Sequence, residues 1–367
     1  MKGKPMNMQT RLITELQKLM AFQPVTADTT ATAALIDYVR QRLETFGMLT
    51  ELRDNNGFKS LVAGTKSLTR SALLLQAHID VVPASPELFV LQREVDILKG
   101  RGTYDMLFGT AAYVVVLENL AQTGTLPLLD LGFILASDEE TGGHNSSGPQ
   151  LDNYVCDVCF LPDAGGKDQL SIGAKGVLNL KVTVQGKSGH AARPTDYRNP
   201  IYDMATLIHE LHEAFPNSDP QATTCSLTKL QSGDAINQVA ALATLMLDIR
   251  FTPDDEPDDL QAKVAEVVVS HNTTVERTDC QPGFEIDFNH PELQKFARLY
   301  QTDTGRIMRP MLAPGSTDGR FLAARGIPVI MLRPDGGNLH GADEFVSLAS
   351  LVEFTEVLQH YITDKQV

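Results

Sequence analysis

The sequence is poor in the residues that mark several classes of protein. Among 367 residues it has no tryptophan, which excludes nothing, and only four cysteines, Cys156, Cys159, Cys225 and Cys280. Four are too few for a disulfide framework in a chain of this length, and their scarcity fits a reducing cytoplasm. Cys156 and Cys159 form a C-x-x-C pair, but no second pair follows at zinc-finger spacing, so we interpret them as structural.

The chain also lacks long apolar runs and clusters of basic residues. The sequence contains no run of 18 apolar residues, so no transmembrane helix is predicted. The N-terminal segment has no apolar region typical of a signal peptide. The net charge of −15 argues against nucleic acid and anionic membranes as partners. These features together predict a cytoplasmic protein.

What the chain does have is a repeating alternation of helical and strand-like segments. Helical periodicity marks residues 9–22 and 28–47, and residues 109–120 predict a further helix. Short apolar runs bounded by turn residues predict buried strands at 59–64, 72–80, 130–137 and 155–162. The pattern indicates an α/β domain with helices on both faces of a mixed sheet.

The pattern changes near residue 173. From there the order becomes strand, helix, strand, strand, helix, strand, which is typical of a ferredoxin-like α+β domain. The first pattern resumes after residue 286, with helices at 291–303, 317–325 and 347–363 and a strand at 327–332. The sequence therefore predicts an α/β domain of residues 1–175 and 286–367, with an α+β domain of residues 176–285 inserted into it.

One predicted strand ends on two polar side chains. In LLLQAHIDVVPAS the apolar run from Leu73 leads to His78 and Asp80. Side chains alternate along a strand, so positions 78 and 80 point to the same side. The pair has two interpretations at this point: a histidine paired with an acid in the core, or part of a ligand site.

Four further stretches place an acid or an imidazole at a strand end or a glycine-rich turn. They are GRGTYDM with Asp105, ILASDEETGG with Glu139 and Glu140, CFLPDAGG with Asp163, and GGNLHGADE with His340. Ligands of open α/β sheets bind beyond the carboxyl ends of the strands. Histidine and carboxylate ligands without a thiolate favour Zn²⁺, Mn²⁺ or Co²⁺. Such a set suits two metals that share one carboxylate, hold a hydroxide between them and hydrolyse amides.

These motifs, in this order, resemble the zinc-dependent exopeptidase and deacylase family. That family includes acetylornithine deacetylase, succinyl-diaminopimelate desuccinylase, peptidase T and carboxypeptidase G. The matching motifs run from residue 78 to residue 344. The inserted domain resembles the family's dimerisation or lid domain, so the resemblance implies a homodimer and makes residues 1–175 and 286–367 the catalytic domain.

The resemblance also assigns the metal ligands. Asp105 would bridge two divalent ions, most simply zinc, with cobalt or manganese as alternatives. His78 and Asp163 would hold one ion, and Glu140 and His340 the other. It further implies that the peptide bond after Asp105 is cis.

Two acids receive other roles. The resemblance makes Glu139 the general base and then the general acid to the leaving amine, which suits a carboxylate one hydrogen bond from a metal-bound water. Asp80 would hydrogen-bond the far nitrogen of His78 and thereby fix its tautomer.

In the inserted domain the resemblance points to His190, Asn237 and Arg250. His190, in GKSGHAARP, would reach into the partner subunit's site and stabilise the oxyanion, and Asn237 and Arg250 would hold a substrate carboxylate. Gly315 and Ser316 match the family's glycine-rich substrate loop. The alternatives are a solvated loop histidine, an arginine paired with Asp248, and a helix N-cap by Ser316 or Thr317.

The predicted reaction is hydrolysis of a small peptide by an amino-, di- or tripeptidase-type enzyme. Asp163 favours this, because relatives that act on peptides with a free N-terminus resemble the chain in having Asp there. The alternative is an N-acyl amino acid deacylase. A non-catalytic peptide-binding protein is a third hypothesis, which the intact set of acids and histidines disfavours. One departure from the family's D-M-K-G pattern, Leu107-Phe108, leaves the candidate ligands intact.

Overall fold

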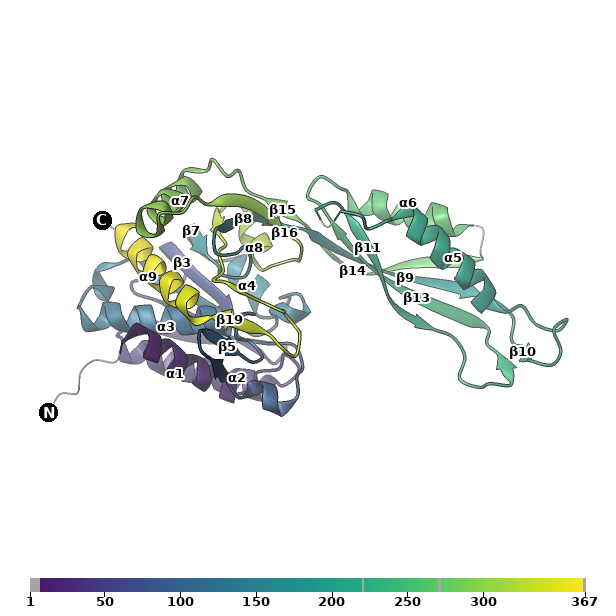
Figure 1. Cartoon of the computed structure of the whole chain (residues 1–367), viewed down its shortest axis with the longest axis horizontal. Helices are drawn as coiled ribbons and strands as arrows, with labels where there is room; N and C mark the ends of the chain where they lie inside the picture. The colour runs from purple at the N-terminus through teal and green to yellow at the C-terminus, as the bar shows by residue number, and fades with distance from the viewer. Residues whose placement is uncertain (1–6, 220, 270–271, 366–367) are drawn as a thin grey trace. The chain divides into compact units, whose positions relative to one another are not determined.

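A computed structural model describes residues 7–219, 221–269 and 272–365 of the chain (Figure 1). The chain divides into two compact units. Unit 1 comprises Met1–Ile172, Ile286–Met311 and Thr317–Val367, and unit 2 comprises Gly173–Glu285 and Leu312–Ser316. Among the described residues, no helix combines the length and apolar character needed to cross a bilayer.

Unit 1 is built on a six-stranded mixed sheet with the order β1-β2-β6-β3-β7-β17. Strands β6, β3, β7 and β17 run parallel to one another, whereas β2 runs antiparallel to both of its neighbours, β1 and β6. This confirms the predicted mixed sheet. The strands are β1 (Leu49–Asn55), β2 (Phe58–Gly64), β3 (Arg70–His78), β6 (Leu131–Ala136), β7 (Val155–Phe160) and β17 (Val329–Ile330).

Helices cover both faces of this sheet. Leu75 of β3 is the register partner of Phe133 of β6, so these side chains share a face, and Phe133 packs edge-on against Tyr113 of α3 (Leu107–Gln122). Gln76 points to the other face. There it donates a hydrogen bond to Asp318, the N-cap residue of α8 (Gly319–Ala323). The predicted two-sided cover is therefore present.

The helices of unit 1 follow the sequence pattern closely. In α1 (Met8–Ala21) the apolar stripe Leu12, Leu16 and Leu19 is fully buried, and the Asn7 side chain caps the helix by accepting from the Thr10 N–H. Helix α3 packs against both α1 and α9, and is buried on nearly every side. The other helices are α2 (Thr29–Thr45), α4 (Ser147–Leu151), α7 (Pro291–Thr304) and α9 (Leu348–Lys365).

Strand β1 was not among the predicted strands. It forms an edge hairpin with β2, and none of its residues is buried. An edge strand without a buried face carries no alternating apolar pattern, which is why periodicity missed it. The turn Asn56-Gly57, with φ of 53° and 85°, is the hairpin signal that the sequence did contain.

Unit 2 contains a four-stranded antiparallel sheet with the order β11-β13-β9-β14. The chain order is β9 (Gly176–Gln185), α5 (Pro200–Ala214), β11 (Thr224–Gln231), β13 (Leu242–Phe251), α6 (Pro257–Val268) and β14 (Thr273–Gln281). Alternate residues of β9 and β13 pack with α5 and α6 into one apolar core. This is the ferredoxin-like order predicted from the sequence.

The predicted boundaries differ from the units in two places, and residues 173–175 belong to unit 2 rather than to the first domain. Leu312–Ser316 belongs to unit 2, where the Lys175 N–H donates to the Ala313 carbonyl oxygen. That contact joins residues far apart in the sequence, so no local pattern indicates it. The remaining strands are β4 (Gln92–Glu94), β5 (Ile97–Lys99), β8 (Gln169–Ala174), β10 (Gly189–His190), β12 (Gln238–Val239), β15 (Phe284–Glu285), β16 (Arg309–Ala313), β18 (Gly336–Gly337) and β19 (Phe345–Ser347).

Candidate metal centre

The carboxyl ends of three of the four parallel strands carry candidate site residues. His78 ends β3, the Glu139–Glu140 pair follows β6, and Asp163 follows β7. Because these strands are parallel, their carboxyl ends lie along the same edge of the sheet. Strand β3 ends at His78, two residues before Asp80, and the Asp80 carboxylate lies 3.5 Å from His78 Nδ1.

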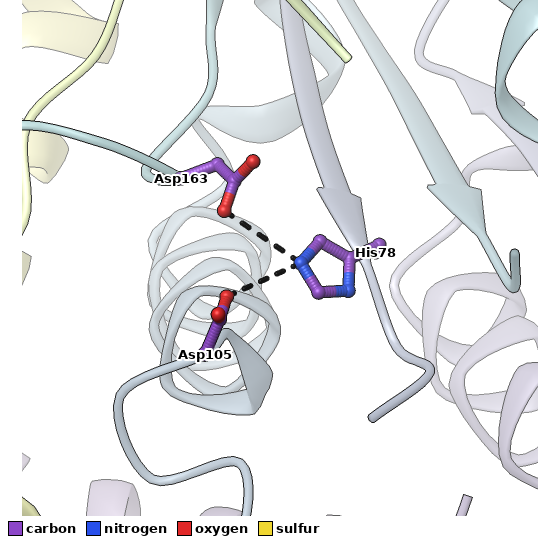
Figure 2. Close-up of side chains that lie close together, drawn as sticks. All are labelled: His78, Asp105 and Asp163. Atoms are coloured by element: carbon purple, nitrogen blue, oxygen red, sulfur yellow. Dashed lines mark ion pairs between the residues drawn. The ribbon is translucent and has the colours of Figure 1, made fainter. Parts of the chain in front are cut away.

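The first group of ligand-type side chains is His78, Asp105 and Asp163 (Figure 2). Figure 2 shows both carboxylates pointing toward the same ring nitrogen. His78 Nε2 lies 3.4 Å from Asp105 Oδ1 and 3.6 Å from Asp163 Oδ1. All three residues are buried, and Asp105 comes from the loop that precedes α3.

The second group is Asp105, Glu140 and His340. His340 Nε2 lies 3.4 Å from Asp105 Oδ2 and 3.2 Å from Glu140 Oε2. Asp105 therefore offers one oxygen to each group, as expected of a bridging ligand. The Asp105–Met106 peptide bond is cis, which confirms that prediction.

The donor atoms of both groups fit divalent metal ions. His78 Nδ1 lies 3.0 Å from the backbone oxygen of Asp80 and donates to it, which leaves the Nε2 lone pair facing the carboxylates. Within the described part of the chain, His78 Nε2 and Glu140 Oε1 are buried and have no hydrogen-bond partner. Buried polar atoms without a partner are costly, and coordination to a cation satisfies them.

The electrostatics of both groups also favour a cation. Burial lowers the pKa of His78, but contacts with Asp105, Asp163 and Asp80 raise it more, so its pKa lies well above the usual value. Contacts with Asp105 and Glu140 raise the pKa of His340 to about 10. The negative potential that attracts a proton to these imidazoles equally attracts a divalent ion, which displaces the proton on binding.

Glu139 faces the first group. Its Oε2 lies 3.9 Å from His78 Nε2, and its side chain is only 13 % exposed. Burial and the neighbouring Asp163 carboxylate raise the pKa of Glu139 well above the usual value. A raised pKa suits a carboxylate that must take up a proton and release it again.

The Asp80 carboxylate contacts the turn after β6 more closely than the imidazole. It lies 3.5 Å from His78 Nδ1, whereas the backbone oxygen of Asp80 accepts that N–H at 3.0 Å. Its two oxygens accept from the Glu139 and Glu140 N–H groups at 3.2 Å each, and Thr26 Oγ1 donates at 2.9 Å. Asp80 therefore orients the Glu139–Glu140 turn, and the predicted carboxylate hydrogen bond to His78 is replaced by the backbone one.

Glu344 organises the loop that carries Asp105. Its buried carboxylate accepts from the backbone N–H groups of Gly102, Tyr104 and Asp105 at 2.8–3.0 Å and from Arg101 at 2.6 Å. Arg101 also donates to the backbone oxygen of His340 at 2.9 Å. This pair links the Asp105 loop to the His340 loop. The sequence analysis missed it, although both residues lie inside the quoted motifs GRGTYDM and LHGADE.

Arg333 was also missed. Its guanidinium is buried and donates to Asp163 Oδ1 at 2.7 Å and to Asp105 Oδ1 at 3.3 Å. It lies over the Tyr104 ring, 5.3 Å from the ring centroid. Its position in the sequence could have indicated a place in the site. Arg333 directly follows the apolar run IPVIML, just as Asp163 follows an apolar strand.

The other predicted residues lie mostly in unit 2. His190 and Asn237 are exposed, and the Asn237 backbone oxygen accepts from the Ala191 N–H beside His190. Arg250 pairs through two N–H groups with Asp248, which is the alternative weighed for it. Gly315 and Ser316 lie in the segment before α8, whose N-cap residue is Asp318 rather than Ser316 or Thr317, and Thr317 Oγ1 accepts from the Gly319 N–H.

The fold and the two ligand groups define a metal-dependent hydrolase. Residues 74–364 match the model of peptidase family M20/M25/M40, and the chain belongs to this family. The resemblance inferred from the motifs is thereby confirmed.

Named relatives include both desuccinylases and peptidases. Succinyl-diaminopimelate desuccinylase of Bordetella avium is 30 % identical over 345 residues, covering 85 % of this chain and 88 % of that protein. The corresponding protein of Janthinobacterium sp. is 29 % identical over 339 residues, covering 83 % and 87 %. A tripeptidase structure from Staphylococcus aureus has a TM-score of 0.78 at 20 % identity, covering 98 % of each chain, which shows the shared fold.

Proposed function

We propose that this chain is a dinuclear-metal amidohydrolase that cleaves small peptides, with zinc as its metal. The observation that carries the proposal is the sharing of Asp105 by two ligand groups. Its two oxygens face His78 and His340 separately, each at 3.4 Å. His78, Asp105 and Asp163 would hold one ion, and Asp105, Glu140 and His340 the other.

Glu139 is the proposed proton carrier. Bound divalent ions supply Lewis-acid polarisation of the scissile carbonyl and lower the pKa of a coordinated water. The Glu139 carboxylate takes the proton of the attacking water and delivers it to the amine nitrogen that leaves. The backbone N–H of Glu139 donates a hydrogen bond to the Asp80 carboxylate, which holds Glu139 beside the first ligand group.

The substrate class has two candidates. By the resemblance set out in the sequence analysis, Asp163 supports a peptide with a free N-terminus. A second candidate is N-acyl amino acid deacylation, which the desuccinylase relatives favour. Asn237 and Arg250 would hold the substrate carboxylate in either case, although binding at Arg250 requires rearrangement of its pair with Asp248. Gly315 and Ser316 would line the substrate loop.

Metal analysis combined with a substrate screen tests this proposal. We expect two divalent ions per chain, loss of hydrolysis after chelation, and recovery on adding Zn²⁺, Mn²⁺ or Co²⁺. Dipeptides, tripeptides and N-acyl amino acids are assayed in parallel, and cleavage of acyl substrates alone would select the second candidate. One ion per chain at saturation, or undiminished hydrolysis by the metal-free protein, would contradict the dinuclear mechanism.

We further propose a homodimer formed through unit 2, with His190 acting in the partner's site. Strand β11 is an edge of its sheet, and its residues from Ser226 to Gln231 are exposed. An exposed edge strand is a template for pairing, and a two-fold contact would cover it. His190 is exposed in unit 2 and would donate a hydrogen bond to the oxyanion, where loss of one donor costs ~10²–10³-fold in kcat.

Subunit mixing tests the role of His190. Homodimers of His190→Ala and of Glu139→Gln are each expected to be nearly inactive, but a heterodimer regains one site with both groups, so activity returns. His209→Ala, which removes another exposed histidine of unit 2, serves as the control and keeps the wild-type rate. Absence of recovery despite proven subunit exchange, or a fully active monomer, would refute action in trans.

A further inference from the structure

Arg333 contacts the same two carboxylate oxygens that the first ligand group presents to His78. Asp105 Oδ1 and Asp163 Oδ1 lie 3.4 Å and 3.6 Å from His78 Nε2, and 3.3 Å and 2.7 Å from the Arg333 guanidinium. The second ligand group uses different oxygens, Asp105 Oδ2 and Glu140 Oε2. The hydrogen bonds of Arg333 to these carboxylates go to the Oδ1 atoms of Asp105 and Asp163.

We propose that Arg333 makes the two metal positions unequal, so that the Glu140–His340 position binds its ion tightly and first, and the His78–Asp163 position binds more weakly and second. The inference rests on the proposed dinuclear centre and deepens it. It assigns to Arg333, which has no role in the motifs, control over the affinity for the second ion.

Two effects of Arg333 on the first group oppose each other. Its hydrogen bonds orient the Asp105 and Asp163 carboxylates, which favours metal binding. Its permanent positive charge, one hydrogen bond away from both ligand oxygens, repels a divalent cation. Repulsion between a single and a double charge in a buried site exceeds the orienting effect of one side chain, so the net result is weaker binding.

The charge balance of the cluster leads to the same conclusion. The carboxylates of Asp80, Asp105, Asp163, Glu139 and Glu140 surround the two histidines. The guanidinium of Arg333 lowers the net negative charge of this cluster by one. Its contacts go to oxygens of the first group, so the ion at the His78–Asp163 position experiences most of this loss of attraction.

Calorimetric titration of the metal-free full-length protein with Co²⁺ tests the proposal, with the visible absorption of bound Co²⁺ as an independent readout. We expect two steps of different affinity in the wild type. In Arg333→Met the weaker dissociation constant falls at least about tenfold while the tighter one changes little. Arg333→Lys keeps the charge and is expected to retain two unequal steps.

Arg325→Met is the matched control. Arg325 belongs to the same unit and donates hydrogen bonds to the Leu151 and Tyr154 backbone oxygens. The Arg325→Met substitution removes one positive charge, as Arg333→Met does, but leaves the ligand groups unchanged. Both Co²⁺ dissociation constants should therefore match the wild type. Equal effects of Arg325→Met and Arg333→Met would attribute the change to net charge and overturn the proposal.

Ligand variants in the wild-type background locate the steps even if Arg333→Met fails to fold. His340→Ala should abolish the tight step, and His78→Ala the weak one. The opposite assignment, two equal steps in the wild type, or weaker binding by folded Arg333→Met would overturn the role of Arg333. Absence of any Co²⁺ binding to the wild type would instead refute the dinuclear centre itself.

Discussion

Replacing Glu139 with glutamine is expected to lower kcat by ~10²–10⁴-fold while both metal ions stay bound. Glutamine keeps the size and the backbone hydrogen bond of this residue but cannot take the proton of the attacking water. Glu139 lies near the first ligand group without belonging to either group of close ligand atoms. Rate measurements at saturating substrate, paired with metal analysis of the same sample, check the prediction.

The neighbouring carboxylate supplies the matched control. Glu140 lies 3.2 Å from His340 in the second group, so Glu140→Gln should weaken metal binding there, and added metal should restore part of the rate. Added metal should not restore Glu139→Gln. A Glu139→Gln protein with both ions bound and the wild-type rate would show that another group carries the proton.

Replacing Glu344 with alanine is expected to lower the free energy of unfolding by ~3–5 kcal/mol. The substitution leaves the buried guanidinium of Arg101 without its partner, which lies at 2.6 Å. It also removes the acceptor for the N–H groups of Gly102, Tyr104 and Asp105. Chemical denaturation of the metal-free protein measures the change without a contribution from metal binding.

Glu94→Ala is the control for this substitution. Glu94 pairs with Lys99 at 2.7 Å, nearly the same distance as Glu344 to Arg101, but its side chain is 61 % exposed. Water screens such a pair, so its loss should cost at most ~1 kcal/mol. Similar losses for the two variants would mean that burial of the Arg101–Glu344 pair contributes little to stability.

Much of the candidate metal centre could be predicted because its residues lie at the ends of apolar strands or in glycine-rich turns, which are visible in the sequence. His78 ends an apolar strand and Asp163 follows one. Parallel strands align their carboxyl ends, so residues 85 positions apart in the sequence were expected to meet, and the structure places His78 Nε2 at 3.6 Å from Asp163. The roles of these residues as ligands remain predictions, which the metal titrations test.

The sequence alone determined three features of the fold. They are the positions of the main helices and buried strands, the alternation that indicates a mixed α/β sheet, and the ferredoxin-like order of the second unit. Periodicity within one segment is sufficient for these features, because burial of one face imposes it locally. The roles of Arg333, Glu344 and the Asp80 carboxylate were decided only by the tertiary structure. Arg333 meets Asp163 across 170 positions and Glu344 meets Asp105 across 239. A charged residue with a distant partner leaves no periodic signal, and only folding determines which buried charges become neighbours.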